Sequence, residues 1–171
     1  MKERKEIIMK LQNETIIMPL PDDSLIEYFE DSYGPFVLPE DYKMFLKKYN
    51  GVVPETRVFD FHDYEYVVEQ FLCLLERPIE DPINGMYEIR VVMTQLDERL
   101  QDGFDEDATG YQVVPIAALF AGNFLCLDYR TSDVPSIAIW FHEESEEYSP
   151  EMVKIADSFS EFLDMLYESE E

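Results

Sequence analysis

The segment DEDATG at residues 105–110 carries residue types that begin a calcium-binding loop. Asp105, Asp107 and Thr109 fall at its first, third and fifth positions. Such a loop also needs a bidentate carboxylate at its twelfth position, which here is Ile116. The same letters match a phosphatase nucleophile motif, but that motif follows a buried strand, and the preceding LQDGF is not one. The sequence therefore predicts a solvated acidic loop.

His142, Glu143 and Glu144 match the start of an HExxH zinc helix, whose second histidine comes four residues after the first. That position is Glu146, so the second ligand is missing. With 2 His, 2 Cys and 6 scattered Gly, there is little material for a catalytic triad and no glycine-rich phosphate loop. We therefore predict no catalytic residues, no metal and no cofactor. A divalent-metal hydrolase using the acids of residues 102–107 is the enzyme alternative.

Both cysteines, Cys73 and Cys126, lie in apolar runs, so we expect buried thiols and no disulfide. The longest nearly apolar run, residues 113–122, is too short to span a bilayer and contains a proline. The residues that follow Lys10 lack the continuous apolar region of a signal peptide. Together these features predict a cytoplasmic protein.

The chain is strongly acidic, because 38 Asp and Glu against 13 Lys and Arg give a formal net charge of -25. This charge disfavours nucleic acid and anionic membranes as partners and favours a basic protein. An acidic surface that serves only solubility is an equally good interpretation. The clusters singled out for partner binding are Glu143, Glu144, Glu146 and Glu147 with Tyr148, and Asp102, Asp105, Glu106 and Asp107.

Three helices that would position these loops have clear signals. Ser24 with Glu27, and Ser158 with Glu161, have the spacing of capping boxes that begin helices. These helices are expected to bury Ile26, Phe29 and Tyr33, and Phe159, Phe162, Leu163 and Leu166. A third helix is expected to begin with Pro39 at its first position. It presents one apolar stripe, and the residues at its end tolerate the left-handed conformation. Its stripe is Tyr42, Phe45, Leu46 and Tyr49, and its end is Asn50 and Gly51.

The remaining segments predict strands and one further helix. We expect a buried strand at residues 67–75, preceded by a loop that carries Phe59, Phe61, His62 and Tyr64. Residues 84–103 favour a helix ended by Gly103, and the runs 111–116, 123–129 and 136–142 favour consecutive antiparallel strands. The prediction is a single α+β domain with a mainly antiparallel central sheet flanked by helices. Its core spans residues 21–167, residues 1–20 are ambiguous between helix and extended chain, and 168–171 form a frayed acidic tail.

Four segments in this order resemble the SUKH superfamily, which groups bacterial toxin-immunity proteins with fungal cell-wall-assembly regulators. They are LPEDYKMFLKKYNG at 38–51, VVPIAALFAGNFLCLDY at 113–129, IAIWFHEE at 137–144 and SFSEFLDML at 158–166. Their signature residues have structural roles and are Leu38, Pro39, Tyr42, Phe45, Leu46, Gly51, Pro115, Gly122, Asp128, Trp140, Ser158, Phe159 and Phe162. The resemblance implies the fold first and function only by analogy.

One position departs from the family pattern. The family usually has Trp-Asp-His-Glu, whereas Phe141 follows Trp140 here, so any polar role of that position is absent. The resemblance and the charge together suggest an immunity protein that binds and occludes a basic toxin, plausibly a nuclease. A regulatory or scaffold domain of the same fold, with endogenous partners, is the alternative. The sequence does not indicate the oligomeric state.

Overall fold

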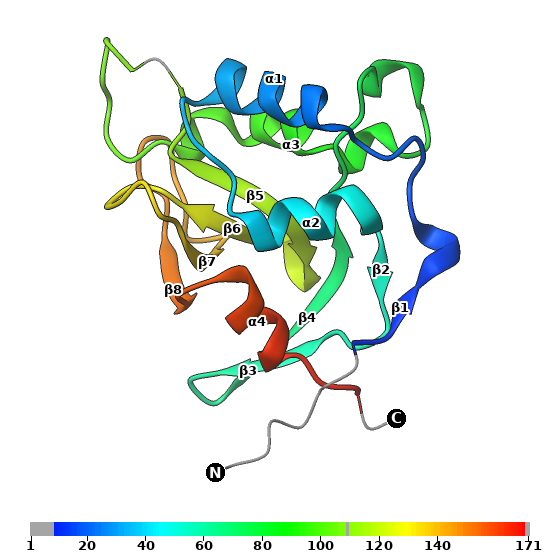
Figure 1. Ribbon diagram of the computed structural model, residues 1–171. Coiled ribbons are helices and arrows are strands. Elements are labelled where there is room, and N and C mark those ends of the chain that lie inside the picture. Colours follow the sequence, from blue (N-terminus) through cyan, green and yellow to red (C-terminus); the bar gives the residue numbers. More distant parts are fainter. Residues whose placement is uncertain (1–8, 109, 170–171) are drawn as a thin grey trace.

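The computed structural model describes residues 9–108 and 110–169, which form one α+β domain (Figure 1). In this part of the chain, six antiparallel strands form a sheet of order β3-β4-β5-β6-β7-β8, and β1 pairs separately with β2. The predicted fold class is therefore confirmed. The strands are β1 (Leu11–Gln12), β2 (Val53–Pro54), β3 (Val58–Phe61), β4 (Tyr64–Phe71), β5 (Val113–Leu119), β6 (Phe124–Asp128), β7 (Ser136–Trp140) and β8 (Met152–Ala156).

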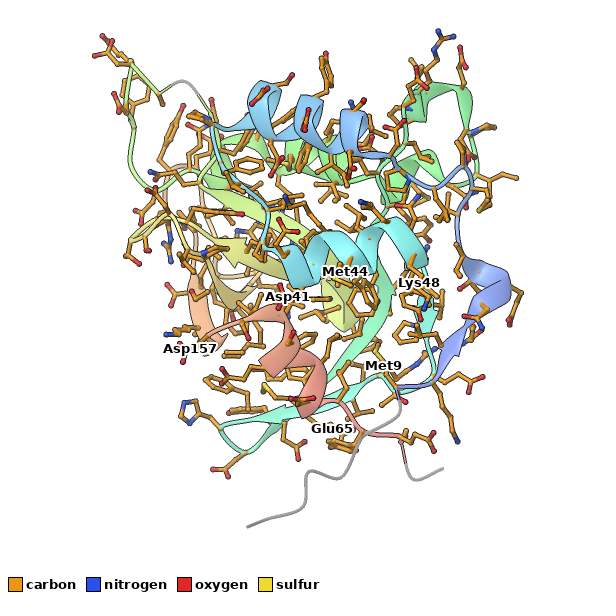
Figure 2. All side chains as sticks on the ribbon, in the orientation of Figure 1. Met9, Asp41, Met44, Lys48, Glu65 and Asp157 are labelled. Atoms are coloured by element: carbon orange, nitrogen blue, oxygen red, sulfur yellow. The ribbon has the colours of Figure 1, made fainter. Side chains whose placement is uncertain are left out.

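Four α-helices occur among the described residues: α1 (Asp23–Tyr33), α2 (Glu40–Tyr49), α3 (Ile89–Leu96) and α4 (Phe159–Met165). Figure 1 shows α1 beside α3 at one end of the sheet, and α2 and α4 across its front. Asp41 Oδ2 joins the two front helices, because it accepts bonds from the N–H and the hydroxyl of Ser160, both at 2.9 Å. Figure 2 shows Asp41 at the end of α2 nearest α4, with the exposed Met44 further along the helix.

Helix α2 confirms most of the sequence interpretation. Tyr42, Phe45 and Leu46 are buried, and Gly51 follows the helix with a left-handed φ of 70°. The Phe45 ring lies 4.7 Å from Phe71 and 5.2 Å from Phe159 between centroids, so the stripe packs on both β4 and α4. Pro39 is the N-cap and not the first helical residue, which moves the predicted start by one position.

The two capping boxes have different outcomes. At α1 the prediction is wrong, because Asp22 is the N-cap and its Oδ1 accepts from the N–H of Leu25 at 2.9 Å. Aspartate caps as well as serine does and occurs two residues earlier, so it starts the helix before Ser24. At α4 the N-cap is Ser158, as predicted, and its Oγ accepts from the N–H of Glu161 at 3.1 Å. The buried residues are Ile26, Phe29, Phe159, Phe162 and Leu166, whereas Tyr33 and Leu163 are half-buried.

The predicted strand at 67–75 and the loop before it are wrong in their bounds. Residues 58–71 form the hairpin β3–β4, whose turn at His62 and Asp63 has left-handed φ values of 48° and 65°. The N–H of Leu72 still donates to the carbonyl of Ile116 in β5, at 2.8 Å. Beyond it the chain stays buried but leaves the sheet, and the N–H of Leu74 donates to the Asn50 side chain at 2.8 Å. Beyond Leu72, hydrogen bonds to the Asn50 side chain therefore take the place of strand-to-strand hydrogen bonds.

Helix α3 ends at Leu96 and not at Gly103, and a 3₁₀ turn follows at Asp97–Leu100. The carbonyl of Glu98 accepts from the N–H of Tyr148 at 2.8 Å. That of Arg99 accepts from Trp140 Nε1 at 3.0 Å. These contacts from distant parts of the chain replace the helical bonds that the local pattern predicted.

The strands β5, β6 and β7 confirm the predicted antiparallel trio, while β1, β2, β3 and β8 lie outside all predicted strands. In the N-terminal region, Leu11 lies in β1, residues 13–15 form a 3₁₀ turn and Ile17 is buried. The alternatives left open for residues 1–20 thus resolve, from residue 9 onward, into short pieces of both extended and turn structure. The expectations for residues 1–8, Thr109 and residues 170–171 lie outside the described residues.

Both cysteines are buried free thiols, as predicted. Burial raises the pKa of Cys73 to about 12 and raises that of Cys126 well above its ordinary value. Cys126 lies in β6, whereas Cys73 lies in the buried segment after β4. In the described residues, no helix combines the length and apolarity that crossing a membrane requires.

Candidate protein-binding surface

The two acidic clusters predicted from distant parts of the sequence meet in space. The N–H of Gly103 donates to the carbonyl of Tyr148 at 2.9 Å. The Phe104 ring packs edge-on against the Tyr148 ring, with centroids 5.4 Å apart. Figure 1 shows both loops on the side of the molecule where β7 and β8 are joined. We call this surface the acidic face; it comprises Asp97, Glu98, Asp102, Phe104, Asp105, Glu106, Asp107, Glu146, Glu147 and Tyr148.

Not all of the predicted partner-binding residues lie together. Glu144 lies toward β4, where its charge contributes, after burial and Tyr64, to raising the pKa of Tyr66. Glu143 is its exposed neighbour at the start of the same loop. The glutamates of the β7–β8 loop are therefore spread out: Glu144 lies near β4, and Glu146 and Glu147 lie on the acidic face.

Arg99 anchors the β7–β8 loop from beneath. Its guanidinium donates to the carbonyl of Ser145 from Nε at 3.3 Å and from Nη2 at 3.1 Å, and also to the carbonyl of His142. The N–H of His142 donates to Asn123 Oδ1 at 2.9 Å. The buried Ser145 accepts from the N–H of Glu151 at 2.9 Å through its hydroxyl. Because both loop ends are held, the exposed glutamates sit on an ordered backbone.

Tyr148 occupies a strained backbone position at the centre of the acidic face. Its φ is 58°, which costs a non-glycine residue on the order of 1–2 kcal/mol. A hydrogen bond with the Glu98 carboxylate, together with the charges of Glu147 and Asp97, raises the pKa of the Tyr148 hydroxyl. The hydroxyl therefore keeps its proton to higher pH than a free tyrosine, and it shares this proton with Glu98.

Asp102 forms an ion pair with Arg130. Arg130 Nη1 contacts its carboxylate at 2.9 Å, and the same guanidinium contacts Asp128 through Nε at 2.9 Å and Nη2 at 3.0 Å. The signature residue Asp128 thus holds the arginine that positions Asp102. Part of the charge of Asp102 is neutralised internally, which leaves Asp105, Glu106 and Asp107 as the freely exposed acids of that loop.

A cavity of about 400 Å3 lies under this loop and is lined in part by Asp102, Asp105 and Asp107. Tyr111 also lines it, and the N–H of Tyr111 donates to the carbonyl of Tyr33 in α1 at 2.8 Å. Across residues 9–108 and 110–169, no three His, Cys, Asp or Glu side chains are grouped so that they could hold a metal ion. The arrangement gives the metal-hydrolase alternative no support.

Sequence reasoning missed Phe104, Asp97, Glu98 and Arg99. Phe104 is 68% exposed, and the available signal was an apolar ring within an acidic segment, with Asp102 two residues before it and Asp105 directly after it. The other three were assigned to a helix that in fact ends at Leu96. No local pattern identifies Arg99, because its partners lie more than 40 residues away.

Three of the signature residues lie at structurally specific positions. Leu38 is buried, and its N–H donates to the buried Glu30 carboxylate at 2.7 Å. Pro115 pairs with Cys126 at a register shift in β5. Gly122 has a φ of 82°, and a Cβ there would lie 3.5 Å from the His142 ring. Of these three positions, only Gly122 contacts the β7–β8 loop, through His142.

The fold therefore defines the class of this protein: an α+β domain with an antiparallel six-stranded sheet and an exposed acidic surface formed by its loops. The family model SUKH_6, described as SMI1-KNR4 cell-wall, matches residues 23–163. The chain belongs to this SUKH family. It is 33% identical over 135 residues to the SPbeta prophage-derived uncharacterized protein YokK of Bacillus subtilis (strain 168). The match covers 74% of this chain and 65% of that relative, which is less than two thirds of its length.

Proposed function

We propose that this protein is an immunity protein that binds a basic toxin, such as a nuclease, through the acidic face and occludes it. The family to which the chain belongs includes toxin-immunity proteins. The observation that carries the proposal is the contact between Phe104 and Tyr148 across two acidic loops. This contact joins separate charge clusters into one surface with an aromatic centre.

The composition of this surface suits fast and specific protein association. Dense negative charge raises the association rate for a basic partner and rejects acidic ones. Buried aromatic side chains supply most of the affinity in typical interfaces, and Phe104 and Tyr148 are the aromatic side chains at the centre of this surface. Since Arg99 already orders the β7–β8 loop, binding would cost little conformational entropy.

The decisive experiment is co-expression of this protein with each toxin encoded beside its own gene. We expect growth to be rescued and a stable complex to be recovered. A Phe104→Ala/Tyr148→Ala variant should fold normally but lose the rescue, whereas Phe120→Ala, which removes another exposed aromatic side chain, should retain it. Failure of every neighbouring toxin to be neutralised, with no toxin in pull-downs, would remove this function.

A regulatory or scaffold domain is the second candidate, and the cell-wall description of the matching family model favours it. It requires endogenous partners in a tagged pull-down and an envelope or growth defect on gene deletion. If pull-downs recover endogenous partners and no toxin, the regulatory or scaffold function is supported and the immunity function is not.

A further inference from the structure

The six-stranded sheet of the described residues has two edges, β3 and β8, and only one of them is covered. At β3, the N–H of Val58 donates to the carbonyl of Tyr167 at 3.1 Å, and the N–H of Tyr167 donates back at 2.8 Å. The Tyr167 hydroxyl also donates to Asp60 at 2.7 Å. The C-terminal segment therefore covers this edge at Val58 and binds the Asp60 side chain beside it.

The β8 edge carries backbone groups that point away from the sheet. The register pairs Val153 with Ile139 and Lys154 with Ala138, and the N–H of Phe141 donates to the carbonyl of Glu151 at 3.0 Å. In an antiparallel ladder, bonded and non-bonded pairs alternate. The N–H and carbonyl of Val153 therefore face β7, and those of Met152 and Lys154 face outward. In the part of the chain that the structure describes, no loop or helix hydrogen-bonds to these outward groups.

The side chains of β8 suit strand pairing at this edge. Met152, Val153 and Ile155 are half-buried, which leaves apolar surface beside the open ladder. Lys154 is 59% exposed and forms an ion pair with Asp157. Figure 2 places Asp157 beyond the end of β8, at the margin of the molecule. An unpaired edge of this kind is a template for another strand.

We propose that β8 accepts a basic β-strand from the partner protein, which extends the sheet by one strand. This inference rests on the proposed function for the choice of a basic partner. Acids lie on both sides of the edge, namely Glu146, Glu147 and Glu151 before β8 and Asp157 after it. A strand that carries lysine or arginine would satisfy the outward backbone groups and neutralise these acids.

Charge also argues against a second copy of this chain as the occupant. Antiparallel pairing of two β8 strands, centred on the middle of the strand, would place Lys154 opposite the same residue of the other copy. Like charges directly opposite each other destabilise a pair of strands. The same register would place Glu151 of each copy opposite Asp157 of the other, so acids would also face acids in a chain of net charge -25.

The test uses the full chain and a labelled synthetic peptide of alternating lysine and valine, about the usual strand length of five or six residues. Binding is followed by fluorescence anisotropy at low and moderate salt, and amide hydrogen exchange locates the contact. We expect saturable binding, weakened by salt, with protection of the Lys154 N–H. A peptide of alternating glutamate and valine is expected not to bind.

Lys154→Pro removes one outward N–H and leaves the bonds to β7 intact, since proline is tolerated on edge strands. We expect it to weaken peptide binding by about tenfold or more, the scale of one to two lost backbone bonds. Lys154→Ala, which removes the same charge but keeps the N–H, should bind at least as well as the wild type. Urea unfolding checks that both variants are folded.

Equal binding by Lys154→Pro, equal binding of the glutamate peptide, or protection elsewhere than β8 would overturn strand addition. So would a wild-type dimer in sedimentation that Lys154→Pro dissociates, since the second copy would then be the occupant. If a toxin is neutralised by the wild type and equally by Lys154→Pro, only the strand addition fails. If the lysine peptide binds at β8 but no toxin is neutralised, only the immunity function fails.

Discussion

Trp140 and Arg99 hold each other in two ways. The indole Nε1 donates to the carbonyl of Arg99 at 3.0 Å, and the Arg99 guanidinium lies 4.9 Å from the centroid of the same ring. The guanidinium then donates to the carbonyls of His142 and Ser145, so the family's core tryptophan is coupled to the loop that carries the acidic surface. The Phe141 departure does not disturb this coupling, because Phe141 packs half-buried against the core.

Arg99→Ala should release the β7–β8 loop. We expect the free energy of unfolding to fall by about 2–3 kcal/mol, from the lost charged hydrogen bonds and cation–π contact. Hydrogen exchange should accelerate at Ser145 and its neighbours while β6 stays protected. Arg99→Lys keeps the charge but not the planar fork, so it should restore little of the loop's protection. Unchanged exchange in Arg99→Ala would show that the loop is ordered by other contacts.

Gly51→Ala should destabilise the protein more than Gly103→Ala. Both glycines are left-handed, with φ of 70° and 82°. A Cβ at Gly51 would lie 2.4 Å from Ile17 Cδ1 and 3.1 Å from Cys73 Cβ, whereas nothing lies within 4 Å at Gly103. We expect losses of about 2–4 kcal/mol and about 1–2 kcal/mol, the second from backbone strain alone. Urea unfolding measures both, and equal losses would refute the steric argument.

Asn50→Ala should be strongly destabilising, because the Asn50 amide ties two segments to α2. Its Nδ2 donates to the carbonyls of Ile17 at 3.0 Å and Leu74 at 3.3 Å, and its Oδ1 accepts from the N–H of Leu74 at 2.8 Å. Each buried group left unsatisfied costs about 1–3 kcal/mol, so we expect a loss of about 3–5 kcal/mol in urea unfolding. The exposed Asn13→Ala is the control and should change stability little. A comparably small loss for Asn50→Ala would mean that water replaces the amide.

Replacing Glu143, Glu144, Glu146 and Glu147 by lysine should weaken binding to the toxin identified by co-expression. We expect a loss on the order of tenfold or more at low salt, mostly in the association rate. The free energy of unfolding should change by less than about 1 kcal/mol, since these side chains are exposed. The matched control reverses four exposed acids on other elements, Glu14, Glu27, Glu55 and Glu69. If the variant with four lysines in the β7–β8 loop binds the toxin with unchanged affinity, the interface does not include this loop.

Stability should fall at alkaline pH as Tyr167 titrates. Its bond to Asp60 raises the pKa of Tyr167 from 10.0 to about 12. Because the folded pKa lies above the unfolded one, the stabilisation is complete below about pH 10 and is lost as the pH rises toward 12. Tyr167→Phe should flatten this loss in urea unfolding. Tyr111, whose pKa burial and Asp97 raise to about 12, contributes in the same window, so Tyr111→Phe should flatten it further. Parallel pH curves for the wild type and both variants would refute this linkage.

The sequence by itself determined the features that depend on neighbouring residues. The apolar stripe of α2, the left-handed Gly51, the Ser158 cap and the three consecutive strands β5, β6 and β7 follow from periodicity and turn chemistry within short windows. The two acidic clusters could also be found, because charge density is a local property.

Only the tertiary structure decided how these parts meet. The end of α3 at Leu96 depends on bonds that residues 98 and 99 form with Tyr148 and Trp140. The union of the two acidic loops through Phe104 and the open edge at β8 likewise depend on long-range pairing. Such pairing produces no periodic pattern in the sequence, because the bonds join residues far apart in the chain. The sequence of either segment alone is that of an ordinary loop.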